Sequence, residues 1–145
     1  MVMNNDDYMN LLDEFYVRLN EVRSRLGRLD DGLTTYLNEQ TEENEELIIS
    51  EAETIKGLLN QAGEFLPEMH KSYKDEGYSA EVVQGVFKTA MATVEGFGDF
   101  LIDIYYEQRQ DVYENAPDRL DEYWGDLKAL MLDVQYAYDD LRANG

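Results

Sequence analysis

Carboxylate side chains recur at a fixed spacing in the segment EGFGDFLIDIYYEQRQD, which covers residues 95–111. These acids stand four residues apart, at Glu95, Asp99, Asp103, Glu107 and Asp111. On one helix they would form a single row that advances about 6 Å at each step. Like charges at this spacing repel one another, and the step is similar to the distance between successive phosphates of a nucleic-acid strand. The row therefore predicts either a solvated face or a surface for a basic partner.

Other residues that commonly carry out chemistry do not stand in patterns that would support it. His70 is the one histidine, and the paired Glu-x-x-His motifs of a di-iron bundle are missing. The chain has no cysteine, which excludes thiolate metal sites and disulfides. No Gly-x-Ser-x-Gly elbow or phosphate-binding glycine loop is present. We expect a protein that is not an enzyme and that uses no metal or cofactor.

Further acids and tyrosines are expected to gather near the end of this row. If four helices alternate in direction, the end of the third lies beside the starts of the second and fourth. The additional candidate partner-binding residues at that end are Glu42, Glu43, Glu45, Glu46, Tyr105, Tyr106, Tyr113, Glu114, Asp118, Asp121 and Glu122. Acids at a helix start favour its dipole, whereas Glu107, Asp111 and Glu114 would oppose the dipole at the end of the third helix. Arg109 has no acid three or four residues away, so we expect it to stack on the neighbouring tyrosines.

The elements that would position these residues follow from the apolar spacing. In four segments apolar residues recur at alternating steps of four and three, which is typical of packed helices. The fourth segment, for example, contains Leu120, Trp124, Leu127, Met131, Val134, Tyr138 and Leu141. We predict one all-α domain over residues 1–145, a left-handed antiparallel four-helix bundle that runs up-down-up-down. Its helices are expected near residues 6–30, 41–66, 79–113 and 117–142, with a kink or short extra helix near residues 67–76.

Capping residues and glycines refine this prediction. The expected N-caps of the first three helices are Asn5, Thr41 and Ser79, and Asn144-Gly145 is a plausible stop. Pro117 suits the first turn of the fourth helix. Gly96 and Gly98 lie inside the third helix, and the apolar spacing continues unbroken past them. This favours close approach of a neighbouring helix or another chain over a bend.

Charge limits the possible partners. The net charge is -20, from 32 acids and 12 bases, and the excess is spread along the chain. Such a field repels nucleic acid and anionic membranes and attracts basic proteins. Four arginines near the end of the first helix, Arg18, Arg23, Arg25 and Arg28, are interspersed with acids and predict pairs within the helix. Neither a signal peptide nor a membrane span is visible, so we expect a cytoplasmic protein.

The opening residues resemble a known family. Met1-Val2-Met3-Asn4-Asn5-Asp6-Asp7-Tyr8, leading into Leu11-Leu12-Asp13-Glu14-Phe15-Tyr16, is similar to the start of phage anti-restriction DNA-mimic proteins. Members of that family are small, all-helical and strongly acidic, and they occupy the DNA-binding groove of restriction enzymes. The rest of the chain departs from that family, with more regular heptads and no acidic C-terminal tail. The resemblance implies an inhibitor that acts in the host cytoplasm.

We therefore expect a nonenzymatic inhibitor of anti-restriction or anti-CRISPR type. It would bind the basic nucleic-acid-binding surface of a defence nuclease, or of another DNA- or RNA-binding protein, as a nucleic-acid mimic. One alternative is an acidic immunity, chaperone or adaptor protein that holds a single basic partner. Another is a structural bundle from a virion or a halophile, which would self-associate, for example as a homodimer, through the face of Gly96 and Gly98.

Overall fold

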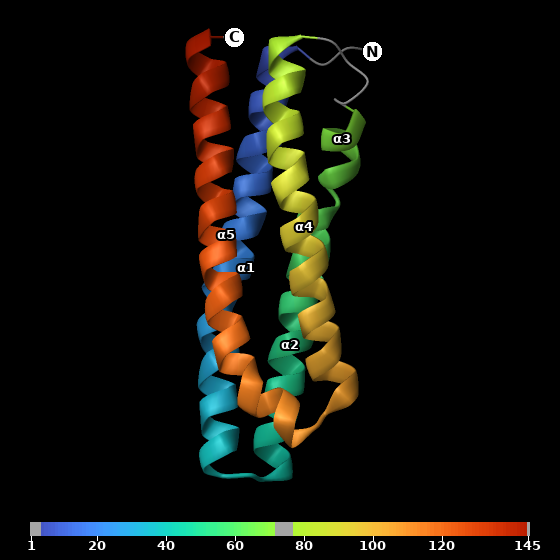
Figure 1. The fold of residues 1–145 in the computed structure, drawn as a ribbon, viewed down its shortest axis with the longest axis vertical. Coiled ribbons are helices and arrows are strands. Elements are labelled where there is room, and N and C mark those ends of the chain that lie inside the picture. Colours follow the sequence, from blue (N-terminus) through green and yellow to red (C-terminus); the bar gives the residue numbers. More distant parts are fainter. Residues whose placement is uncertain (1–3, 72–76, 145) are drawn as a thin grey trace.

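The protein is described by a computed structural model that covers residues 4–71 and 77–144. Its helices are α1 (Asn5–Asn38), α2 (Glu42–Gly63), α3 (Leu66–Lys71), α4 (Tyr78–Glu107) and α5 (Gln110–Asn144). The long helices alternate in direction, and both α1 and α4 pack against α2 and α5 (Figure 1). The short α3 packs against α4. The described residues form no strand, so the predicted all-α antiparallel bundle is confirmed.

One hydrophobic core runs through the bundle and is built from the predicted stripes. Large side chains such as Phe15, Ile55, Phe97 and Leu127 are fully buried in it. The stripe prediction is wrong at Trp124, which is 39% exposed. Its indole lies instead beneath the guanidinium of Arg23, whose Cζ is 5.2 Å from the ring centroid. The apolar spacing thus marks the face that turns inward, although individual stripe positions reach the surface.

Helix α1 is longer at both ends than predicted. Leu29 and Leu33 are fully buried, so the apolar face continues well past residue 30 and stabilises the helix to Asn38. At the other end the N-cap is Asn4 rather than Asn5. The Asn4 side chain accepts from the Asp7 backbone N–H at 2.8 Å, and the Asp7 carboxylate accepts from the Asn4 N–H at 3.2 Å. This reciprocal capping box fixes the start of α1.

Of the other two predicted N-caps, Thr41 is confirmed and Ser79 is wrong. Thr41 caps α2 as expected, and its hydroxyl accepts from the Asn44 backbone N–H at 3.1 Å. Ser79 is not the cap of α4, because the helix begins after Gly77. The Ser79 hydroxyl instead donates to Asn5 Oδ1 at 2.9 Å and ties the starts of α1 and α4 together. The predicted stop at Asn144-Gly145 extends beyond the described residues.

The boundary between the last two helices is shifted from residues 113–117 to residues 108–109. Gln108 has a left-handed backbone with φ 44°, which ends α4. Helix α5 begins at Gln110, so Pro117 lies inside it rather than in its first turn. A proline within a helix removes one backbone hydrogen bond and usually bends the helix. The first turns of α5, in orange, run obliquely before the helix straightens (Figure 1).

Near Pro67 the chain forms the predicted short extra helix. Helix α2 ends at Gly63, before the proline, and α3 covers Leu66–Lys71. The remainder of the predicted segment, residues 72–76, lies outside the described residues.

Gly96 and Gly98 lie in an unbroken α4, so the alternative of a bend is wrong, and each glycine faces a neighbouring helix at an ordinary van der Waals separation. Tyr123 on α5 faces Gly96, whose carbonyl oxygen accepts from the Tyr123 hydroxyl at 2.9 Å. Gly98 faces Leu59 on α2. Both glycines remain partly exposed, so self-association through this face stays a prediction.

Candidate partner-binding surface

Two rows of exposed carboxylates lie on the neighbouring helices α4 and α5. Within each row the acids stand four residues apart, which gives a rise of about 6 Å per step. Those of α4 are Glu95, Asp99, Asp103 and Glu107, and those of α5 are Glu114, Asp118, Glu122 and Asp126. The hydrogen bond between Tyr123 and Gly96 joins the two helices next to Glu95, where the α4 row begins, and next to Glu122 in the α5 row. The two antiparallel rows therefore cover the same part of the bundle axis. The stretches of α4 and α5 that carry the rows are neighbours over about 18 Å of the bundle.

This arrangement corrects the predicted single row from Glu95 to Asp111. The chain turns at Gln108 and Arg109, so Asp111 belongs to the first turn of α5. Glu114 also belongs to α5 rather than to the end of α4, so the dipole of α4 no longer opposes it. Only Glu107 remains at the end of α4, where the dipole opposes it. The predicted opposition between dipole and acids thus holds for one residue of the three.

Arg109 partly neutralises the turn between the rows. Its Nε lies 3.4 Å from Glu107 Oε2 and 3.5 Å from Asp111 Oδ1, so the predicted stacking on tyrosine is replaced by ion pairs. These residues line a hollow of about 230 Å³ with Asp103 and Arg119. Exposed pairs of this kind contribute little stability, but they leave Glu107 and Asp111 less available to a partner than the acids further along the rows.

Arg119 is held against the aromatic residues beneath this hollow. Its Nη2 donates to the Tyr123 hydroxyl at 3.0 Å, and its Cζ lies 5.3 Å from the Phe100 ring centroid. The rings of Tyr123 and Phe100 stack with centroids 5.3 Å apart. The guanidinium therefore packs on the protein rather than projecting across the acidic rows.

The predicted tyrosines are split between core and surface. Tyr113 is fully buried and packs edge-on against Tyr36, with ring centroids 5.1 Å apart, so its prediction as a partner-binding residue is wrong. Burial raises the pKa of the Tyr113 hydroxyl, and the nearby Glu45 carboxylate adds to this effect. Tyr106 is 69% exposed, and the half-buried Tyr105 packs edge-on against it.

The predicted acids of α2 lie at the same end of the bundle, where α1 joins α2 and α4 joins α5 (Figure 1). Glu42, Glu43 and Glu45 occupy the first turn of α2, and Glu46 follows one residue after Glu45. There the helix dipole stabilises negative charge. These acids therefore have an ordinary structural reason for their position, and they belong to a different helix from the two rows.

Asp121 is not part of either row. It lies across the seam between α1 and α5 from Asp30, in a hollow of about 520 Å³ that also includes Asp31 and Trp124. Burial raises the pKa of Asp30, and the charges of Asp121 and Asp31 raise it further. Sequence reasoning missed this group because Trp124 was assigned to the core.

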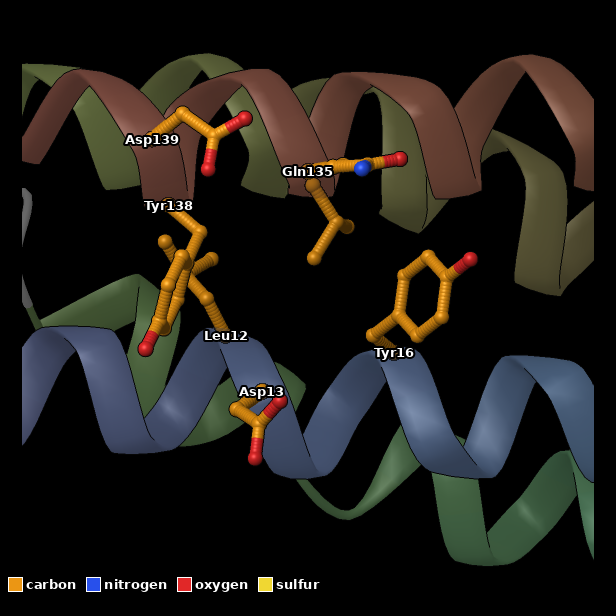
Figure 2. Close-up of a pocket in the computed structure, with 7 residues that line it drawn as sticks. Leu12, Asp13, Tyr16, Gln135, Tyr138 and Asp139 are labelled. Atoms are coloured by element: carbon orange, nitrogen blue, oxygen red, sulfur yellow. The ribbon is translucent and has the colours of Figure 1, made fainter. Parts of the chain in front are cut away.

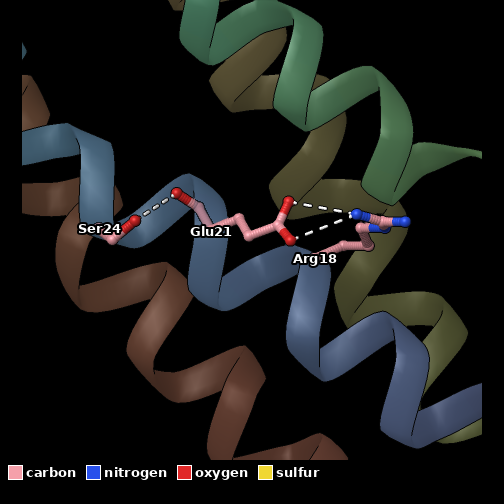
Figure 3. A network of polar contacts seen from close by, with 3 residues as sticks. All are labelled: Arg18, Glu21 and Ser24. Carbon is pink, nitrogen blue, oxygen red and sulfur yellow. Dashed lines mark hydrogen bonds and ion pairs between the residues drawn. The ribbon is translucent and has the colours of Figure 1, made fainter.

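Among the four arginines of α1, the predicted pair within the helix is present at Arg18. Arg18 Nη1 lies 3.3 Å from the Glu21 carboxylate, and the Ser24 hydroxyl donates to the Glu21 backbone oxygen at 2.8 Å (Figure 3). Arg23 is different, because it crosses to Trp124 on α5. No basic patch that would contact nucleic acid follows from these two arginines.

Two features are absent from residues 4–71 and 77–144. Within them no three histidine, aspartate or glutamate side chains are grouped as a metal site requires. No helix of this part of the chain is both long and apolar enough to cross a membrane.

We also compared the chain with protein-family models, with curated proteins and with solved structures, and none of them matched. The resemblance of the opening residues to anti-restriction proteins therefore stays a prediction.

Proposed function

We propose that the protein is a nonenzymatic inhibitor that occupies the basic nucleic-acid-binding surface of another protein. A defence nuclease is the expected kind of target, and the carboxylate rows of α4 and α5 form the proposed contact surface. The observation that carries the proposal is the pair of adjacent, exposed rows with a common four-residue step. A net charge of -20 surrounds them and would steer a basic partner toward the protein.

The spacing of the charges supports mimicry of a nucleic acid. Two rows with a step of about 6 Å supply one negative charge per roughly 3 Å of bundle axis. Duplex DNA carries one per about 1.7 Å, so the rows reach about half that density. They extend over about 18 Å, the length of about five base pairs. Lysine and arginine side chains that normally contact phosphates would meet carboxylates held on rigid helices.

The test compares two variants that lose the same number of charges. The first neutralises the rows with Asp99→Asn, Asp103→Asn, Asp118→Asn and Glu122→Gln. The control neutralises four exposed acids elsewhere, with Glu14→Gln, Glu53→Gln, Glu64→Gln and Glu81→Gln. Both are assayed, with the unmodified protein, for inhibition of DNA cleavage by purified restriction and RNA-guided nucleases. Far-UV circular dichroism checks that each variant remains helical.

If the proposal is correct, the protein inhibits at least one of these nucleases, and added short duplex DNA reduces this inhibition by competing for the same surface. The row variant should lose at least about tenfold in inhibitory potency, and the control variant much less, because only the first removes contacts to the basic surface. Equal losses in the two variants would contradict the assignment to α4 and α5. Inhibition that DNA does not compete would instead identify an acidic adaptor that binds outside the nucleic-acid groove.

A further inference from the structure

The seam between α1 and α5 contains a hollow that pairs aromatic rings with unneutralised acids. It has a volume of about 260 Å³ and is lined by Tyr16 and Asp13 on α1 and by Tyr138 and Asp139 on α5, among others. The two tyrosine rings stand on either side of the gap, with an aspartate from each helix beside it (Figure 2). Both aspartates are exposed. We call this site the tyrosine hollow.

A second hollow of similar composition lies further along the same seam. The tryptophan hollow has a volume of about 520 Å³, and its lining includes Trp124, Asp30, Asp31 and Asp121. Gly27 and Gly125 also line it, and a Cβ at either glycine would have no neighbour within 4 Å. The raised pKa of Asp30 reflects burial and the repulsion from the other two acids. A bound cation would relieve that repulsion.

The acids of both hollows form no ion pair with a cation of residues 4–71 and 77–144. The ion pairs within residues 4–71 and 77–144 involve Glu21, Glu68, Glu107 and Asp111, and none of these lines either hollow. Aromatic faces and carboxylates together favour a guanidinium group, which can stack on a ring while it donates to an acid. The guanidinium of Arg23, one turn before Gly27, already lies over the Trp124 ring, with its Cζ 5.2 Å from the centroid.

From this composition we propose that the α1–α5 seam binds a basic protein segment, with one arginine side chain in each hollow. An anionic ligand is excluded by the acids, and a second copy of the chain would bring another net charge of -20 against the seam. The hollows are about 14 residues apart along α1, or about 21 Å. An extended chain covers that distance in about six residues. None of the row carboxylates of α4 and α5 lines either hollow, so this inference concerns a different surface from the proposed nuclease-binding rows.

The probe is a synthetic glycine-serine peptide that carries two arginines six residues apart. Its comparison peptide has the same composition with the two arginines adjacent, so the two differ in geometry and not in net charge. Binding is measured by isothermal titration calorimetry and by the fluorescence of Trp124, the single tryptophan of the chain. The spaced peptide is expected to bind with one-to-one stoichiometry and about tenfold more tightly than the comparison peptide, and to change the fluorescence. A peptide with two lysines in the spaced positions should bind more weakly.

Matched charge variants assign the binding to the seam. Asp13→Asn with Asp139→Asn removes the acids of the tyrosine hollow, and Asp30→Asn with Asp121→Asn removes two from the tryptophan hollow. Each pair should weaken binding of the spaced peptide by about tenfold. The control pair Glu53→Gln with Glu81→Gln removes two exposed charges elsewhere and should weaken it less than about twofold.

Three results would overturn the inference. They are equal binding of the two arginine peptides, equal weakening by the control pair, and an unchanged fluorescence when the calorimetric titration is complete. None of these measurements uses a nuclease, so failure of the seam and failure of the proposed inhibition are separate outcomes.

Discussion

Replacing both glycines inside α4 with alanine is expected to stabilise the bundle. Glycine in a helix interior costs about 1 kcal/mol relative to alanine. A Cβ at Gly96 would lie 3.7 Å from the nearest atoms of Tyr123, and one at Gly98 would lie 3.8 Å from Leu59 Cδ2. These are ordinary van der Waals separations, so the methyl groups fit without displacing their neighbours. We expect about 0.5–1 kcal/mol for each substitution and about 1–2 kcal/mol for Gly96→Ala with Gly98→Ala.

The free energy of unfolding is measured by urea titration with far-UV circular dichroism, and Tm by thermal unfolding. For a chain of this size we expect a rise in Tm of about 2–4 °C for each kcal/mol. Gly57→Ala is the matched control, because a Cβ at Gly57 has no neighbour within 4 Å and only helix propensity changes. At Gly77, where φ is 132°, alanine should destabilise the protein. A double variant less stable than the unmodified protein, alongside a stabilised Gly57→Ala, would refute the spacing described around α4.

Three further predictions concern single side chains. Tyr123→Phe removes the hydrogen bond from α5 to the Gly96 carbonyl and should lower the free energy of unfolding by about 0.5–1.5 kcal/mol in urea titrations. Because the pKa of Tyr113 is raised from 10.0, the unfolded chain releases this proton at a lower pH than the native protein, so stability falls as pH rises above about 10. Tyr113→Phe should reduce that loss in denaturation series at successive alkaline pH values. The raised pKa of Asp30 means that its ionised form opposes folding, so Asp30→Asn should stabilise the protein at pH 7 by less than about 1 kcal/mol. This difference should vanish below the ordinary pKa of 3.8, where both folded and unfolded carboxyls are protonated.

The sequence predicted the architecture because the same physical constraint produces both pattern and fold. A helix that buries one face must repeat apolar residues at steps of three and four, and four such stripes can close one core. The short connections then require antiparallel neighbours, and that order placed the starts of α2 and α5 beside the end of α4 (Figure 1). The general location of the candidate surface followed from topology alone.

The details of the site depended on one turn that composition did not mark. Gln108 adopts a left-handed backbone, which is more often a position for glycine or asparagine. Pro117 looked like a helix start. Tyr113 and Ala116, in the turn just before the proline, are both buried, and their tertiary packing keeps this turn helical. Moving the boundary from Pro117 to Gln108 changed the relation of Asp111 to the dipole and turned one predicted row into two.

The other errors in the predicted site concern residues on the border between core and surface, whose burial was assigned wrongly. Tyr113 and Trp124 are both large aromatic residues at helical spacings that suit either environment. Packing against Tyr36 buries the first, whereas the second lies at the α1–α5 seam beside a small residue, Gly27. Neither outcome follows from the spacing within one helix, because the neighbouring helix decides how much of each ring is covered.

The rows impose a cost on the fold, and that cost bears on their purpose. Each row contains three like-charged pairs at the four-residue spacing, and such a pair destabilises a helix by about 0.2–0.5 kcal/mol. Together the rows oppose folding by roughly 1–3 kcal/mol, a noticeable share of the 5–15 kcal/mol typical of a domain. Solubility alone does not require this, because a surface with interspersed charges of both signs keeps a bundle in solution and adds favourable pairs. Binding to a basic surface would account for it, because the repulsion within the rows is relieved when lysine and arginine side chains approach. If the rows serve a partner, neutralising them should therefore stabilise the free protein and weaken the complex, two opposite effects that a merely solvated face would not combine.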